Sequence, residues 1–131
     1  MADVIVLDAS VLIAFLDGED PHHAAAESLF RSAVEDDLGV NSLTLAEVLV
    51  APARDGRLGA VRGALRDLGV DELPFPPDAA ERLARLRVLT GLKMPDCCVL
   101  LAVEGTGSSA ASFDDRLTRV AEGLGVPVVR A

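Results

Sequence analysis

The sequence lacks several residue types and patterns that would assign it to familiar classes of protein. It has no Trp or Tyr, only four Phe, and a single lysine among its 12 basic residues. With Lys93 as the only lysine, no Walker A phosphate-binding loop is present. The longest unbroken apolar run, 97–103, is too short to cross a membrane, and Asp3 stands where a signal peptide would carry basic residues. We therefore expect a cytoplasmic protein with no membrane partner.

The few cysteines and histidines do not form a metal-binding or redox motif. Cys97 and Cys98 are adjacent, which suits neither an ordinary disulfide nor the closing of a loop, so we expect buried packing residues. His22 and His23 are also adjacent. Neighbouring residues of a helix point in different directions, so this pair cannot bind one metal ion as an i, i+4 pair can. We interpret both histidines as residues at the start of a helix.

Acidic residues outnumber basic ones, and the excess lies near the amino terminus. The chain has 21 Asp and Glu against 12 Lys and Arg, a net charge of −9, and residues 1–37 hold nine acids and one base. Affinity for nucleic-acid phosphates comes from Lys and Arg, so an acidic chain is usually a poor general nucleic-acid binder. Binding to nucleic acid would require the remaining basic residues and cations that offset the acids.

Short apolar runs of strand length alternate with longer segments of helical periodicity. This order predicts one α/β domain, residues 1–131, with a central, mostly parallel sheet of about five strands and helices on both faces. The predicted strands cover 4–7, 38–41, 70–75, 109–113 and 126–129. Helices are predicted after Asp8, from His22, from a cap at Ser42 or Thr44, from about Gly56 to Leu68, from Asp78, after Pro95 and over 116–124.

Three aspartates stand at junctions that a parallel sheet would bring together. Asp8 follows the buried strand 4–7 and Asp114 follows the strand 109–113, so both occupy the carboxyl edge where open α/β sheets bind ligands. Asp96 lies in the first turn of an apolar helix. Two of them also have a simpler explanation, since Asp8 or Ser10 could cap the following helix and Asp96 could simply be placed favourably in the dipole of its helix.

Glu47 is the only charge in the run LTLAEVLVA. A helix here is apolar almost all round, so we expect Glu47 to be withdrawn from bulk water, and a buried ionised Glu needs partners or a cation. The alternative is a polar residue on a narrow exposed stripe. Three or four carboxylates around one pocket would repel each other unless a hard cation neutralised them, and oxygen ligands favour Mg²⁺ or Mn²⁺.

Four segments together resemble the PIN-domain family, in particular the VapC-type toxins of bacterial toxin–antitoxin modules. They are VIVLDASVLIAFL, TLAEVLV, MPDCCVLLAV and ASFDDRL, in this order and spacing, and they cover nearly the whole chain. The pieces that carry the resemblance are D-x-S near the amino terminus, a helical Glu, P-D before an apolar helix and S/T-x-D after the fourth strand.

The resemblance implies a PIN-like fold with an acidic metal site at Asp8, Glu47, Asp96 and Asp114. It leaves open whether Asp114, Asp115 or both approach a metal. It further implies a Mg²⁺- or Mn²⁺-dependent endoribonuclease that hydrolyses RNA with metal-activated water. Its partners would be a cognate VapB-type antitoxin and a second copy of the chain, in a heterotetramer or larger assembly.

Several polar and basic side chains are candidates for RNA contacts, because phosphate groups bind hydroxyls and cationic side chains. They are Ser10, Ser112, Arg54, Lys93 and Arg116. Arg57, Arg62 and Arg66 extend the basic series, although such a run is equally natural as a solvated helix face paired with nearby acids. Two other functions remain open, a catalytically inactive PIN-like binding module and a Mg-dependent phosphatase-like hydrolase.

Overall fold

Strands and helices alternate along the chain in the predicted order. The computed structural model describes residues 4–106 and 108–129, and within them it contains four strands and seven helices. The strands are β1 (Val4–Leu7), β2 (Asp37–Asn41), β3 (Val70–Leu73) and β4 (Ser109–Ala111). The helices are α1 (Ala9–Leu16), α2 (His23–Ser32), α3 (Ser42–Arg54), α4 (Leu58–Asp67), α5 (Ala79–Thr90), α6 (Met94–Thr106) and α7 (Asp115–Gly123).

The four strands form one parallel sheet in the order β3-β2-β1-β4. The predicted fifth strand, 126–129, contributes a single parallel bridge between Val128 and Ala110. Two backbone hydrogen bonds flank this bridge, from Ala110 to Pro127 and from Val129 to Ala110, at 2.9 and 2.8 Å. Pro127 has no N–H to donate, so the pairing cannot extend through its backbone nitrogen. The predicted sheet of about five mostly parallel strands is thereby confirmed.

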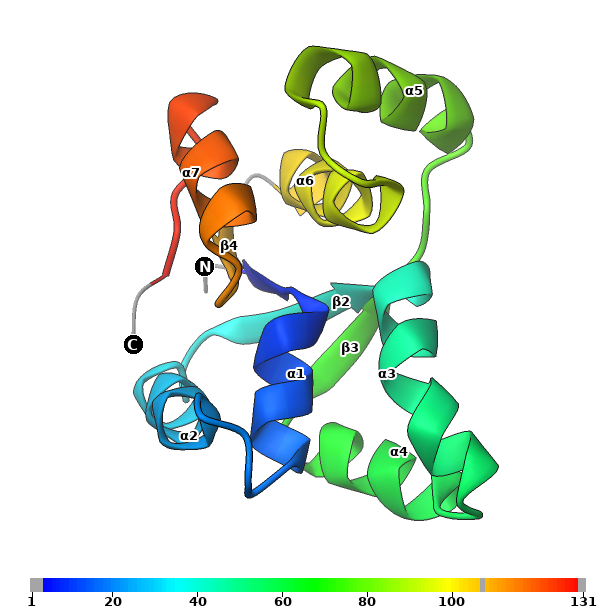
Figure 1. Ribbon diagram of the computed structural model, residues 1–131, viewed down its shortest axis with the longest axis vertical. Coiled ribbons are helices and arrows are strands. Elements are labelled where there is room, and N and C mark those ends of the chain that lie inside the picture. The colour runs from blue at the N-terminus through cyan, green and yellow to red at the C-terminus, as the bar shows by residue number, and fades with distance from the viewer. Residues whose placement is uncertain (1–3, 107, 130–131) are drawn as a thin grey trace.

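Helices cover both faces of the sheet and enclose two hydrophobic cores. Along the central strand β1, Ile5 and Leu7 belong to the core shared with α1, α2, α3 and α4, whereas Val6 belongs to the core shared with α5, α6 and α7. This alternation follows from the period of two in a β-strand. Figure 1 shows α5, α6 and α7 above the sheet and α1, α2 and α4 below it. The prediction of helices on both faces is confirmed.

Helix α3 begins where predicted, but its cap is a different residue. Asn41, the last residue of β2, is the N-cap: its Oδ1 accepts a hydrogen bond from the Thr44 N–H at 2.9 Å, and its Nδ2 donates to Thr44 Oγ1 at 2.8 Å. The expectation of a Ser42 or Thr44 cap is therefore wrong. Asn41 and Thr44 are both buried, so their mutual hydrogen bonds also satisfy polar groups that water cannot reach.

Helix α6 is the most buried helix and carries both cysteines. Cys97 and Cys98 are free thiols buried in the core, as predicted. Because α6 packs between the sheet and α5, nearly all faces of its middle turns are covered, which explains its all-round apolar sequence. None of the helices in the described part of the chain is both long and apolar enough to cross a membrane.

The backbone at the end of α5 requires a glycine, which gives a matched pair of stability predictions. Gly91 ends α5 with φ of +69°, where a Cβ is strained, whereas Gly63 lies within α4 with open space around its missing Cβ. We expect Gly91→Ala to lower the free energy of unfolding by about 1 kcal/mol and Gly63→Ala to raise it by up to about 1 kcal/mol. Urea unfolding measures both, and equal effects of the two changes would contradict this explanation.

Candidate active site

Two serine hydroxyls hold the side chain of Asp8. This residue follows β1 and is buried, and its Oδ2 accepts hydrogen bonds from Ser10 Oγ at 2.8 Å and Ser112 Oγ at 2.7 Å. Asp8 occupies the N-cap position of α1, but its side chain makes no capping hydrogen bond. The simpler explanation of Asp8 as a helix cap therefore does not describe this side chain.

Backbone groups hold the same two serines in place. Ser10 Oγ accepts a hydrogen bond from the N–H of Phe113 at 2.9 Å, and Ser112 Oγ accepts one from the N–H of Asp114 at 2.9 Å. Each hydroxyl therefore receives one hydrogen and donates its own to Asp8. The turn between β1 and α1 is joined in this way to the turn between β4 and α7, far away in the sequence.

Asp8 keeps one carboxylate oxygen free. No residue that the structure describes donates to Oδ1, whereas Oδ2 takes both hydroxyls. Among the same residues, every fully buried side-chain oxygen or nitrogen has a hydrogen-bond partner, so Oδ1 must reach solvent. The carboxylate is thus fixed by one oxygen and open at the other.

Asp114 and Asp115 stand at the start of α7 and differ in what their side chains do. Asp114 is the N-cap, and its Oδ1 accepts a hydrogen bond from the Leu117 N–H at 2.9 Å, which leaves Oδ2 without a donor among the described residues. Asp115 lies in the first turn and is exposed. Both carboxylates are near the positive end of the helix dipole, which stabilises negative charge.

Asp96 lies close enough to Asp8 and Asp114 to be affected by their charges. It is half-buried in the first turn of α6, and its pKa is raised from 3.8 to about 6, first by burial and then by the charges of Asp8 and Asp114. Position in a helix dipole alone would lower this pKa, so burial and repulsion outweigh it. The three predicted aspartates therefore form one electrostatic cluster, which we call the Asp cluster.

The structure does not withdraw Glu47 from solvent, and that expectation is wrong. Helix α3 leaves one stripe uncovered, and Glu47 lies on it together with Leu43, Ala46 and Val50. Glu47 still lies near α6, because its charge helps to raise the pKa of Cys98 to about 11, after the larger effects of burial and of Cys97. It is not among the described charges that raise the pKa of Asp96.

The predicted RNA-contact residues fall into two groups. Lys93 and Arg116 lie near the Asp cluster, since both charges lower the pKa of Asp96, and Arg116 also donates to the Gly91 carbonyl at 3.1 Å. Arg54 is exposed in the last turn of α3, at the far end of a helix about 20 Å long. The structure therefore brings Lys93 and Arg116 to the site and leaves Arg54 away from it.

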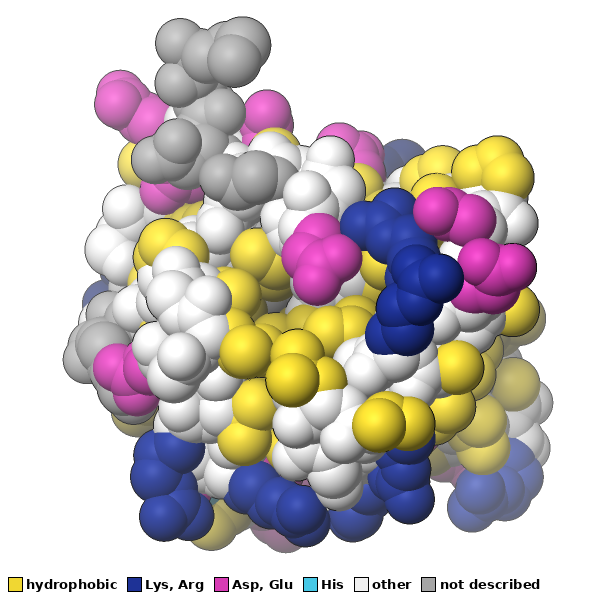
Figure 2. Space-filling model, turned by 90° about the horizontal axis from the view of Figure 1, so that it is seen from above, with side chains coloured by type: hydrophobic (Ala, Val, Ile, Leu, Met, Phe, Trp, Pro, Cys, Tyr) yellow, Lys and Arg dark blue, Asp and Glu magenta, His cyan; other side chains and the backbone are white. Residues whose placement is uncertain are grey.

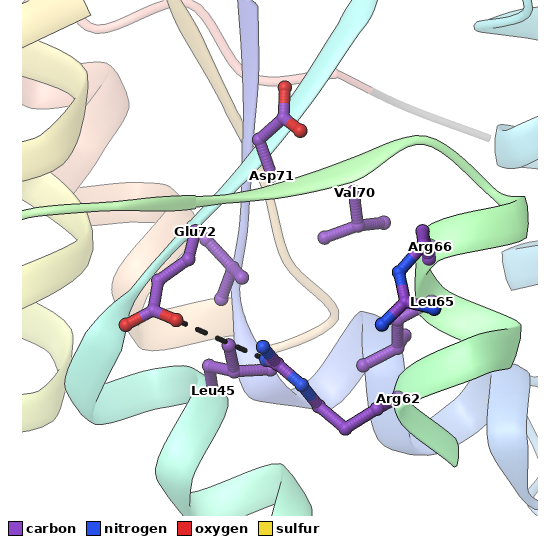
Figure 3. A pocket seen from close by; sticks show the side chains of 8 residues that line it. Leu45, Arg62, Leu65, Arg66, Val70, Asp71 and Glu72 are labelled. Carbon is purple, nitrogen blue, oxygen red and sulfur yellow. Dashed lines mark ion pairs between the residues drawn. The ribbon is translucent and has the colours of Figure 1, made fainter. Parts of the chain in front are cut away.

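The basic residues of α4 face acids on the neighbouring strand. Arg62 lies 3.9 Å from Glu72 across a small pocket of about 190 Å³ between α4 and β3, as Figure 3 shows. Arg66 also lines this pocket. The lining includes no member of the Asp cluster. Arg62 thus matches the solvated, paired helix face that was the alternative to an RNA-binding edge.

The donor set of the Asp cluster suits a hard divalent cation. Among the described residues, no group of three or more Asp, Glu, His or Cys side chains lies in an arrangement that could hold a metal ion. Mg²⁺, however, is usually held by one or two carboxylates and keeps several waters. Asp8, Asp96 and Asp114 each retain an oxygen with no donor among the described residues, so these residues fit such an ion.

Sequence reasoning missed the two serines as groups that hold Asp8. They were predicted as RNA contacts, yet in the structure both hydroxyl hydrogens are donated to Asp8. The spacing D-x-S was the only signal for Ser10, and no local signal linked Ser112 to Asp8. The interpretation of His22 and His23 as helix-start residues is confirmed, because they are the N-cap and first residue of α2.

Comparison with known proteins agrees with this fold. The family model described as PIN domain matches residues 5–123. No curated protein matches the chain. Three similar solved structures illustrate the likeness.

VapC20 of Mycobacterium tuberculosis, described as a Sarcin-Ricin loop cleaving toxin, has a TM-score of 0.78 and 19% identity, covering 97% of this chain and 99% of that one. A toxin–antitoxin complex from Klebsiella pneumoniae has a TM-score of 0.75 and 22% identity over 95% of both chains. PAE2754 from Pyrobaculum aerophilum has a TM-score of 0.62 and 25% identity, covering 98% of this chain and 84% of that one.

At identities of 19% and 22%, the first two likenesses establish a shared fold. The family model, in contrast, spans all strands of the sheet and all seven helices described above. The chain therefore belongs to the PIN domain family.

Proposed function

We propose that this protein is a metal-dependent endoribonuclease, the toxin of a VapBC-type toxin–antitoxin module, which hydrolyses RNA phosphodiester bonds. One observation carries the proposal: Asp8, Asp96 and Asp114 form a single cluster at the carboxyl edge of the sheet, each with an open carboxylate oxygen. Membership of the PIN domain family and the likeness to a Sarcin-Ricin loop cleaving toxin support the substrate class.

Asp8, Asp96 and Asp114 would hold Mg²⁺ or Mn²⁺. Such an ion would neutralise the cluster, activate water and polarise the phosphate of the substrate. Glu47 is exposed and belongs to the proposed site only as a group that approaches it from α3.

The chain's own residues prepare this site in two ways. Ser10 and Ser112 fix Asp8 through Oδ2 and so direct Oδ1 outward, which holds the carboxylate in one orientation before substrate binds. Lys93 and Arg116 add positive charge beside the cluster, where a phosphate group of RNA would lie. Figure 2 shows that Lys and Arg side chains gather along one edge of the molecule, so the acidic chain still offers local positive charge.

An antitoxin partner is supported by an apolar groove that begins at the carboxyl-terminal half of α1. Ile13, Leu16, Val48, Pro52 and Val61 line this groove of about 360 Å³ between α1, α3 and α4. Solved structures of similar fold include a toxin–antitoxin complex from Klebsiella pneumoniae and FitAB bound to a DNA fragment. We propose that an apolar segment of a VapB-type antitoxin occupies the groove, within a heterotetramer or larger assembly built on a homodimer.

Removing the charge of Asp8 should abolish catalysis and leave the fold intact. We expect Asp8→Asn to lower Mg²⁺- or Mn²⁺-dependent cleavage of a fluorogenic RNA at least about 100-fold, because the ion loses its central ligand. Circular dichroism and thermal unfolding serve as the folding control. Wild-type protein that binds RNA without cutting it would favour the inactive binding module, and cleavage of a chromogenic phosphate monoester alone would favour the phosphatase-like hydrolase.

The neighbours Asp114 and Asp115 should differ in their effect on cleavage. Asn is a good N-cap, so Asp114→Asn keeps the hydrogen bond to the Leu117 N–H and removes only the charge. We expect this change to reduce RNA cleavage at least about 10-fold, the lower end of the loss typical of an altered metal ligand environment, and Asp115→Asn to leave it within about twofold. The same metal-dependent assay measures both. A larger loss in Asp115→Asn would assign the fourth carboxylate position to Asp115.

The charge of Asp96 should destabilise the metal-free protein at neutral pH. Its folded pKa of about 6 lies above the ordinary 3.8, so the folded state binds this proton more tightly, and stability falls as pH rises from about 4 through 6. We expect Asp96→Asn to raise the free energy of unfolding by about 1 kcal/mol at pH 7.5, a value already lowered to allow for solvent screening of the partly exposed Asp96. Near pH 4, where Asp96 is already protonated in the folded protein, the gain should almost vanish. Urea titrations in EDTA test this, and an equal gain at both pH values would contradict it.

A further inference from the structure

An aromatic pair adjoins the Asp cluster along the chain. The rings of His22 and Phe113 are stacked, with centroids 4.7 Å apart and planes within 9° of parallel. Phe113 stands between Ser112, which holds Asp8, and Asp114. The pair therefore adjoins the site along the chain, although His22 comes from the start of α2 and Phe113 from the turn after β4.

Hydrogen bonds hold both members of the pair in place. The Phe113 N–H donates to Ser10 Oγ, so the backbone under this ring is part of the network around Asp8. The Phe113 side chain also packs against the core shared with α1 and α2. On the other side, the His22 N–H donates to Asp20 Oδ1 at 2.8 Å, and the imidazole lies 3.8 Å from the same oxygen. The stack is thus preorganised before any ligand binds.

One face of the His22 imidazole lies on Phe113, and more than half of the His22 side chain is exposed. Its side chain remains 56% exposed even though one face lies on Phe113. Two of the four Phe, Phe15 and Phe30, contact each other in the core. Phe75 follows β3, and β3 lies three strand spacings, about 14 Å, from β4 in the sheet. Within the described residues, the His22–Phe113 stack is therefore the aromatic surface that adjoins the cluster.

We propose that the His22–Phe113 stack binds a nucleobase of single-stranded RNA next to the phosphate that the Asp cluster cleaves. This inference rests on the proposed ribonuclease function. Proteins recognise unpaired bases by stacking them on aromatic side chains, including His, and each such contact contributes substantially to affinity. A base stacked on the exposed side of His22 would extend the stack by one ring. The phosphate of the same nucleotide would then lie toward the Asp cluster, where Lys93 and Arg116 add positive charge.

A role in substrate binding differs measurably from a role in joining α2 to the β4–α7 turn. We would measure KM and kcat on a mixed-sequence fluorogenic single-stranded RNA, and repeat the assay with an abasic nucleotide at each position near the cleavage site. We expect His22→Ala to raise KM at least about fivefold with kcat within about twofold. At one abasic position we expect the KM of wild type to rise by the same factor. At that position the KM of His22→Ala should rise no further. His22→Phe should restore KM, because it restores a ring.

Two control variants separate stacking from general effects. His23→Ala removes the neighbouring imidazole, which contacts the Ala14 carbonyl at 2.8 Å and packs near Phe15, so it should change stability and leave KM unchanged. Phe75→Ala removes a 38% exposed ring at the distant end of the sheet and should also leave KM unchanged.

The outcomes distinguish this inference from the function on which it rests. A wild-type protein that cleaves no RNA with Mg²⁺ or Mn²⁺ would overturn the ribonuclease proposal and this inference together. Two results would overturn the stacking site alone, provided that the wild type cleaves RNA. One is an unchanged KM in His22→Ala. The other is an increase in KM that is the same in His22→Ala as in wild type at every abasic position.

Discussion

The site depends on one shared acceptor, the Oδ2 atom of Asp8. Two hydroxyls, from Ser10 and Ser112, donate to it, and the backbone N–H groups of Phe113 and Asp114 donate to those hydroxyls in turn. The arrangement is available only because β1 and β4 are parallel neighbours, a pairing that continues through the hydrogen bond from the Asp8 N–H to the Ala111 carbonyl at 2.9 Å. The sheet therefore sets the position of the site, and the serines set its orientation.

This arrangement concentrates negative charge where the fold alone would not favour it. Burial and two neighbouring carboxylates raise the pKa of Asp96 to about 6, while Lys93 and Arg116 offset only part of that effect. A cluster selected for stability alone would contain a neutral residue here, and retained repulsion of this kind is typical of functional sites. A divalent cation would relieve the repulsion, and it would offset part of the net charge of −9 at the place where a polyanion would bind.

The surfaces around the cluster divide by chemistry. Lys93 and Arg116 supply charge beside it, and the His22–Phe113 stack supplies an aromatic face. Apolar surface is supplied by the uncovered stripe of α3 with Leu43 and Val50 and by the groove between α1, α3 and α4. Exposed apolar area of this kind suits a protein partner more than RNA, so substrate and antitoxin would approach through different parts of the molecule.

Local sequence patterns were sufficient to predict the elements and the three aspartates. Short apolar runs located the strands, helical periodicity located most of the helices, and chain direction placed Asp8 and Asp114 at the carboxyl edge, as the structure shows. Only the tertiary structure decided which surfaces are covered and which distant residues meet. Glu47 is exposed because no element of the described part of the chain packs over its stripe of α3, and periodicity alone does not show which face of a helix is covered. Ser112 reaches Asp8, and His22 reaches Phe113, because the sheet closes contacts between segments far apart in sequence, which no local pattern encodes.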